Sequence, residues 1–208
     1  MYKSNIKQEI IKIGQMMSAR GMVGTFEGNI SYLDDDAIYI TPSGQSKELL
    51  TEEMIIVTDR NMNILEGKGK PSSELTMHLK AYELRPDARS VIHCHAPYCT
   101  AYAINNKAIE SNAMAEINIL FGGRIPLLPF GLPGTDEIIK GYENYLEYNV
   151  ILLANHGMLA IGSSLIDAYS KTVTAEMMAH ILFISDMMGG AKDIPEADVN
   201  RLRSMLQK

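Results

Sequence analysis

The chain has 208 residues, a net charge of −6 at pH 7 and 46% hydrophobic residues. This length and ordinary apolar content predict one globular domain over residues 1–208 and exclude a disordered or fibrous chain. The acidic balance leaves no basic surplus for phosphate backbones, so no nucleic-acid partner is expected. No apolar run reaches the ~18 residues that cross a bilayer, so no membrane partner is expected either.

The cellular compartment is predicted from the N-terminal residues and the cysteines. Residues 1–14, MYKSNIKQEIIKIG, mix charges into an amphipathic pattern and lack the apolar centre of a signal peptide. The two cysteines, Cys94 and Cys99, lie in one apolar stretch and do not make a disulfide framework. We therefore expect a cytoplasmic protein.

Helices and strands alternate along the whole chain. Apolar spacing and capping residues predict helices at 6–17, 72–85, 135–148 and 165–188. Alternating or continuous apolar runs predict strands at 37–41, 54–58, 90–96, 150–154 and 158–162. The last of these is interpreted as a continuation of the strand before it, and the Pro- and Gly-rich stretch 124–135 as irregular. Such close interleaving predicts a three-layer α/β domain.

Two histidines separated by one residue give the sharpest chemical signal. His93 and His95 lie in the strand-like stretch SVIHCHA. On a strand, residues two apart point to the same face, so both imidazoles project side by side and Cys94 points away. Two parallel imidazoles are a ready pair of metal ligands. The alternative is a pair of core histidines hydrogen-bonded to the backbone, which would bury two polar rings that need partners.

His156 extends this pattern. It follows the apolar strand VILLA and precedes Gly157, which would let the backbone turn sharply. Three histidines from two strand ends match the open three-ligand arrangement of a catalytic metal. The alternative for His156 is an ordinary turn residue.

Glu74 is a further candidate because it lies in the first turn of a predicted helix. A carboxylate there is stabilised by the helix dipole, and this suffices to explain it. It could equally serve as a metal ligand and as a base for proton transfer.

Three loops of small residues form a second group. They are Gly28–Asn29, Ser43–Gly44 and Ser72–Ser73. Each offers backbone N–H groups beside a short polar side chain, an arrangement that binds phosphate without many lysines. Each loop alone is also a common turn, but together with a metal site they indicate a phosphorylated substrate.

These motifs, in this order, resemble the class II sugar-phosphate aldolases of the fuculose-phosphate aldolase type. That family also includes ribulose-phosphate 4-epimerase, methylthioribulose-phosphate dehydratase and the adducin head domain. The matching segments are GNIS at 28–31, TPSG at 41–44, PSSE at 71–74, HCHAP at 93–97 and NHG at 155–157. The resemblance implies a three-layer α/β/α domain with a central mixed, largely antiparallel sheet.

The resemblance also implies how the site works. His93, His95, His156 and Glu74 would hold Zn²⁺, or Mn²⁺, Co²⁺ or Fe²⁺ in its place, and Glu74 would also act as acid and base. Gly28, Asn29, Ser43, Gly44, Ser72 and Ser73 would hold the substrate phosphate. The implied reaction is reversible cleavage of a ketose 1-phosphate, similar to fuculose 1-phosphate, into dihydroxyacetone phosphate and an aldehyde through a metal-stabilised enediolate. The implied assembly is a homotetramer with interfacial active sites.

One departure from the family concerns Glu116. Counting back from Gly122, this position is a tyrosine proton donor in the fuculose-phosphate enzymes. A carboxylate there could be the base for C4-hydroxyl deprotonation in an aldolase or the base that starts a dehydration; the alternative is a surface glutamate. Methylthioribulose-1-phosphate dehydratase and ribulose-phosphate 4-epimerase activities on the same site are therefore kept as alternatives, together with a non-catalytic adducin-like interaction module.

Overall fold

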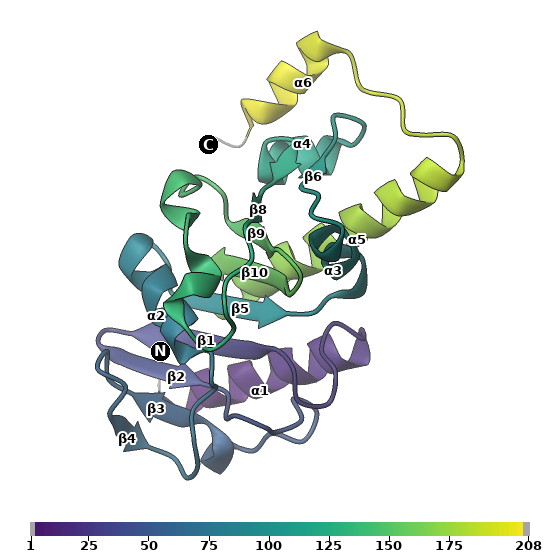
Figure 1. Cartoon of the computed structure of the whole chain (residues 1–208). Helices are drawn as coiled ribbons and strands as arrows, with labels where there is room; N and C mark the ends of the chain where they lie inside the picture. Colours follow the sequence, from purple (N-terminus) through teal and green to yellow (C-terminus); the bar gives the residue numbers. More distant parts are fainter. Residues whose placement is uncertain (1–2, 206–208) are drawn as a thin grey trace.

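A computed structural model describes residues 3–205 of the chain (Figure 1). In chain order, with η for 3-10 helices, its elements are α1 Lys3–Ala19, β1 Asn29–Asp34, β2 Ala37–Ile40, η1 Glu52–Met54, β3 Ile56–Thr58, β4 Ile64–Glu66, α2 Leu75–Leu84, β5 Ser90–Cys94, α3 Pro97–Ile104, β6 Ile109–Glu110, α4 Ala115–Phe121, β7 Arg124–Ile125, β8 Leu127–Leu128, η2 Asp136–Ile139, η3 Tyr142–Asn144, β9 Val150–Leu153, β10 Gly157–Gly162, α5 Leu165–Met187 and α6 Glu196–Arg203.

The centre of the fold is an eight-stranded sheet with the order β4-β3-β2-β1-β5-β10-β9-β8. Every neighbouring pair is antiparallel except β8 and β9, which run parallel. One apolar cluster packs α1, α3 and α5 on one face, and a second packs α2, η2 and η3 on the other. The predicted three-layer α/β/α domain with a mixed, largely antiparallel sheet is confirmed.

Adjacent residues of the central strands pack into opposite layers. On β10, Met158 and Ala160 belong to the cluster on the α5 face, whereas Leu159 and Ile161 belong to the cluster on the α2 face. Because helices cover both faces, such strands read as continuous apolar runs rather than as an alternation. The same period of two places His93, directly opposite Leu159 in the neighbouring strand, on the α2 face.

Two of the predicted elements are wrong in extent. Residues 135–148 do not form one helix but the two short 3-10 helices η2 and η3, because Gly141 between them has a φ of 96°. Only the predicted start is confirmed: the Thr135 hydroxyl accepts a hydrogen bond from the Glu137 amide at 3.2 Å. The stretch 124–135, predicted to be irregular, contains the short strands β7 and β8.

The strand predicted to continue past His156 instead reverses. β9 and β10 form an antiparallel hairpin in which Gly157 lies opposite Leu153. The sharp turn is made at Asn155, whose φ is 56°, and not at the glycine. Asparagine tolerates this left-handed conformation better than other residues with a side chain.

Two further observations concern the chain as a whole. None of the helices within residues 3–205 is long and apolar enough to span a membrane. Cys94 and Cys99 are both buried as free thiols.

Candidate metal centre

Three histidines meet where β5 ends and where β9 turns into β10. The rings of His93 and His156 are stacked with centroids 4.7 Å apart, and the ring of His95 stands edge-on to both. One ligand nitrogen from each ring lies within 4.8 Å of the other two. The structure thus brings together the three histidines singled out in the sequence, although His95 lies one residue beyond the end of β5.

Gly157 makes room for this cluster. A Cβ atom at this position would lie 2.6 Å from the carbonyl oxygen of Cys94 and 2.8 Å from the ring of His95. Glycine is therefore required by close packing against the histidines rather than by an unusual backbone angle.

We expect Gly157→Ala to displace the His95 ring and to weaken metal binding. A misplacement of about 1 Å in a catalytic group costs about 100-fold in rate, so turnover should fall by about that factor, together with the metal affinity. Competition with a chromophoric chelator measures the metal affinity. The control is Gly24→Ala, for whose methyl group the three nearest atoms all belong to the flexible side chain of Glu27. Unchanged affinity in Gly157→Ala would contradict the packing explanation.

Glu74 lies beside the histidines at the N-terminus of α2. Its carboxylate oxygens lie 3.0 Å from Nε2 of His156 and 3.3 Å from Nε2 of His93. Burial raises the pKa of Glu74, but the hydrogen bond from His156, the charge interaction with His93 and the hydrogen bond from Asn29 outweigh burial and lower the pKa. The carboxylate makes no capping hydrogen bond to the helix and is turned toward the histidines instead.

The hydrogen bonds of His93 show that a cation fits here. Its Nδ1 lies 2.9 Å from the carbonyl oxygen of Met158, an acceptor, so Nδ1 carries the proton. Burial lowers the pKa of His93 to about 3, so the ring is neutral and its Nε2 is a bare lone pair. This lone pair faces the Glu74 carboxylate, and Nε2 of His95 is likewise buried without a hydrogen-bond partner. A divalent cation would satisfy all of these atoms at once.

The three small-residue loops lie next to one another. The amide of Ser72 donates to Thr41 at 3.1 Å, and the amide of Ser43 donates to Lys70 at 3.0 Å, which joins the second and third loops. Gly28 and Gly44 both have positive φ angles, of 75° and 67°. Asn29 of the first loop donates to the Glu74 carboxylate at 2.7 Å and the Glu74 amide donates to the Ser72 hydroxyl at 3.2 Å, so the first and third loops both adjoin Glu74.

Lys47 ties two of these loops together and was not singled out in the sequence. Its side chain is buried, and its ammonium donates to the carbonyl oxygens of Phe26 and Gln45 at 3.1 and 3.0 Å. Burial lowers the pKa of Lys47. A lysine in a turn-rich stretch gives no sequence signal that it is buried.

Glu116 is separate from this group. It is exposed on the first turn of α4. Within residues 3–205 it makes no hydrogen bond or ion pair with the histidines or with Glu74. Its role therefore depends on whether another subunit brings it to a metal centre.

A group of buried polar residues lies behind Glu74, and of its members only Asn29 was singled out in the sequence, as a phosphate-binding residue. Asn29 and Ser31 lie two apart on β1, and His78 and Tyr82 lie four apart on α2. Hydrogen bonds connect them in series: Asn29 contacts Glu74, His78 contacts Asn29, Ser31 contacts His78 and Tyr82 contacts Ser31. A signal existed: Glu74, His78 and Tyr82 recur every four residues on one helix face.

The burial of His78 predicts a pH-dependent stability. Burial lowers the pKa of His78 from 6.5 to about 4, so the unfolded state takes up a proton that the folded state does not. The free energy of unfolding is then complete above pH ~6.5 and falls by up to about 3 kcal/mol as the pH drops toward 4. His78→Gln, which does not titrate, should flatten this part of the curve in urea unfolding with a chelator present. Identical slopes would contradict the assignment.

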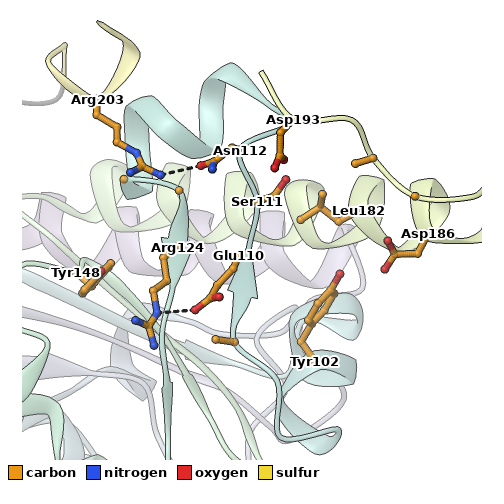
Figure 2. A pocket seen from close by; sticks show the side chains of 15 residues that line it. Tyr102, Glu110, Ser111, Asn112, Arg124, Tyr148, Leu182, Asp186, Asp193 and Arg203 are labelled. Atoms are coloured by element: carbon orange, nitrogen blue, oxygen red, sulfur yellow. Dashed lines mark hydrogen bonds and ion pairs between the residues drawn. The ribbon is translucent and has the colours of Figure 1, made fainter. Parts of the chain in front are cut away.

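A cavity of about 760 Å³ lies elsewhere, between α3, α5 and the β6–β7 pair (Figure 2). None of the histidines or phosphate-loop residues line it. Its arginines already have partners, since Arg124 pairs with Glu110 at 3.0 Å and Arg203 donates to Asn112 at 2.7 Å. The chemistry is therefore assigned to the histidine cluster, where buried nitrogens lack partners, and not to this cavity.

A mixed sheet, three histidines at strand ends and a carboxylate beside loops of small residues together form a candidate metal site of the kind expected from the sequence. Residues 8–183 match the family model described as Class II Aldolase and Adducin N-terminal domain, and the chain belongs to this family. Its relatives are lyases, and the chain is an enzyme of the class II aldolase type.

Three relatives illustrate the similarity. An L-fuculose phosphate aldolase of Methanococcus maripaludis is 36% identical over 85% of this chain and 95% of its own length. A 3-oxo-tetronate 4-phosphate decarboxylase of Haemophilus influenzae is 32% identical over 85% of this chain and 86% of its own. A solved L-fuculose 1-phosphate aldolase, 29% identical, covers 100% of this chain and 99% of its own with a TM-score of 0.90.

Proposed function

We propose that this enzyme reversibly cleaves a ketose 1-phosphate, similar to fuculose 1-phosphate, into dihydroxyacetone phosphate and an aldehyde. The observation that carries the proposal is the pair of buried nitrogens without hydrogen-bond partners, Nε2 of His93 and of His95, which cluster with His156 beside the Glu74 carboxylate. His93, His95, His156 and Glu74 would hold the cation. Their nitrogen-rich set suits Zn²⁺ and also accepts Mn²⁺, Co²⁺ or Fe²⁺.

The chain's own residues supply binding and proton transfer. The loops at Gly28, Ser43–Gly44 and Ser72–Ser73 would hold the phosphate, far from the bond that breaks, and fix the sugar in register. A divalent cation supplies Lewis-acid stabilisation of the negative charge that develops as the C3–C4 bond breaks. Glu74 would return a proton to C3 of the three-carbon fragment. Glu116 would remove the proton from the C4 hydroxyl, whose oxygen becomes the aldehyde oxygen.

A dehydratase is the second candidate, favoured by the carboxylate at Glu116 where the fuculose-phosphate enzymes have a tyrosine. In that reaction the same residue would take a proton from carbon, and water would leave with the carbon chain intact. The names of the relatives likewise include more than one reaction on a phosphorylated substrate.

Mass spectrometry of the products tests the two candidates directly. Metal-loaded protein is incubated with fuculose, rhamnulose, deoxyribulose and methylthioribulose 1-phosphates. Release of dihydroxyacetone phosphate supports the aldolase, and the best substrate identifies the aldehyde. A product lighter by one water overturns the aldolase in favour of the dehydratase. A product of unchanged mass but new stereochemistry indicates a 4-epimerase, and no turnover favours an interaction module.

We further propose that residues 1–208 form one domain of a cytoplasmic homotetramer with its active sites at subunit interfaces. The support is a stripe of apolar side chains on α5, where Met177, Ile181 and Ile184 are 48%, 40% and 40% exposed. Their spacing of four and three residues places them on one helix face, and such patches are typical of interfaces. The exposed position of Glu116 on α4 fits a role in a neighbouring subunit.

Mixed oligomers test the shared site. His93→Ala and Glu116→Gln are each expected to be inactive alone. When they are unfolded and refolded together in equal amounts, a cyclic assembly whose sites use two subunits should recover about a quarter of the wild-type activity. Light scattering gives the oligomeric state in parallel. If the mixture stays inactive in an assembled tetramer, Glu116 does not complete a neighbouring site.

A further inference from the structure

We propose that Asn29 and His78 position the Glu74 carboxylate, at the end of a one-way chain of buried hydrogen bonds. The inference rests on the proposed function of Glu74 as metal ligand and proton carrier. It gives the Asn29 side chain a role different from phosphate binding, the role that its loop motif suggests.

The geometry of the fold sets these groups face to face. Asn29 and Ser31 are two residues apart on β1, and Asn29 lies directly opposite His93 in β5, so both side chains point to the α2 face. His78 and Tyr82 follow Glu74 at intervals of four on α2, so they line the helix face that covers this part of the sheet. A strand period of two and a helix period of four thus place five polar side chains in one row.

The row is sealed from solvent. The five residues Glu74, Asn29, Tyr82, Ser31 and His78 are exposed by 8%, 4%, 3%, 0% and 0%. A buried polar group without a partner is costly, so each member depends on its neighbour's hydrogen bond. Both ends of the Asn29 amide are occupied: Nδ2 donates to Glu74 at 2.7 Å, and Oδ1 accepts from Nε2 of His78.

The direction of donation follows from the chemistry of the acceptors. The Asn29 oxygen can only accept, so Nε2 of His78 must carry a proton. A neutral imidazole then has a bare Nδ1, which accepts from the Ser31 hydroxyl at 2.7 Å. The Ser31 proton is thereby used, so the hydroxyl of Tyr82 donates to Ser31 at 2.6 Å.

The hydrogen bond from His78 affects which end of the Asn29 amide faces the Glu74 carboxylate. The proton on His78 reinforces the orientation in which the amide oxygen faces His78 and the NH₂ group faces Glu74. The amide then holds one carboxylate oxygen in place while the other accepts from His156 at 3.0 Å. Without a donor at position 78 the amide is free to rotate, and its oxygen would repel the carboxylate.

The first test needs neither metal nor substrate. The ¹⁵N shifts of the His78 imidazole in the metal-free protein should identify a neutral ring protonated at Nε2. A ring protonated at Nδ1, or a charged ring at pH 7, overturns the proposal. This result is independent of the reaction that the enzyme catalyses.

The second test compares His78→Leu with His78→Gln, because the glutamine amide can still donate to Asn29. Leucine should lower Zn²⁺ affinity or kcat about 10- to 100-fold, as loss of a group that orients a ligand typically does. The KM for the ketose phosphate should stay unchanged, because the loops are untouched, and glutamine should recover most of the loss. Wild-type Zn²⁺ affinity and kcat in His78→Leu would overturn the proposal.

A pair of tyrosine variants separates positioning from stability. Tyr82→Phe removes the first donor of the chain, whereas Tyr142→Phe removes a buried hydroxyl that donates to Tyr148 in the same layer. Both should lower the Tm, but only Tyr82→Phe should lower kcat or metal affinity. Equal effects of the two variants on activity would mean that the Tyr82 hydroxyl contributes only to stability, which would contradict the proposal. If wild-type protein turns over no substrate, the proposed function fails, while the Zn²⁺ affinities and ¹⁵N shifts still decide the role of His78.

Discussion

The double variant His93→Ala, His95→Ala is expected to lose stoichiometric metal and at least about 1,000-fold in turnover. In both residues Nε2 is buried without a hydrogen-bond partner. Each substitution should therefore remove a metal ligand without breaking a hydrogen bond made by that nitrogen. A catalytic metal contributes several kcal/mol to the transition state, and each 1.4 kcal/mol is tenfold in rate. Metal analysis of the purified protein and a product assay measure the two effects separately.

The control for this variant is His180→Ala. His180 lies on α5, where its ring stacks on Tyr98 at 3.8 Å, away from the cluster. It should keep its metal and most of its activity. A double variant that retained one metal per chain would contradict the assignment of these two histidines as ligands.

Glu74→Gln is expected to lower kcat by about 100- to 10,000-fold, the range typical of a general acid–base group. Glutamine keeps the size and the hydrogen-bonding oxygen but cannot carry the proton, and it removes the negative charge that attracts the cation. The circular dichroism spectrum should remain that of the wild type. Metal content has to be measured alongside, since kcat is meaningful only at equal occupancy.

The matched control for Glu74→Gln is Glu83→Gln on the same helix. The Glu83 side chain is exposed and pairs with Lys80 at 2.9 Å, a surface contact of little energetic value. It should behave as wild type in both assays. Wild-type kcat in Glu74→Gln at full metal occupancy would remove Glu74 from the proton-transfer step.

The sequence predicts strands β5, β9 and β10 better than the connections between them. Continuous apolar runs predict β9 and β10, an alternating run predicts β5, and the helix predicted over 165–188 nearly matches the ends of α5. The hairpin between β9 and β10 was not predicted. Its left-handed residue is Asn155, whereas the sequence pattern favoured Gly157 as the turn residue. The helix predicted over 135–148 is broken at Gly141 for a reason of backbone conformation that apolar spacing does not report.

Some residues of the candidate site could likewise be predicted from the sequence, and others could not. The histidines could be placed together because a strand period of two and a strand end are local properties. The neighbours of Asn29 could not be found, because they depend on the register of β1 against β5 and on the packing of α2 over both. The position of Glu116 relative to a second subunit is a property of an assembly and not of one chain's local pattern.

The place in the sheet of the strands around the histidine cluster has a consequence for how the enzyme can change. β1, β5 and β10 are interior strands, each paired on both sides, whereas β4 and β8 form the edges. Amide hydrogens near Asn29 and His93 should therefore exchange with deuterium only through large-scale opening, while the edges and the short helix α4 exchange earlier. Glu116 lies on that peripheral helix. Substitutions can thus accumulate around α4 during evolution without loosening the strands that surround the histidines.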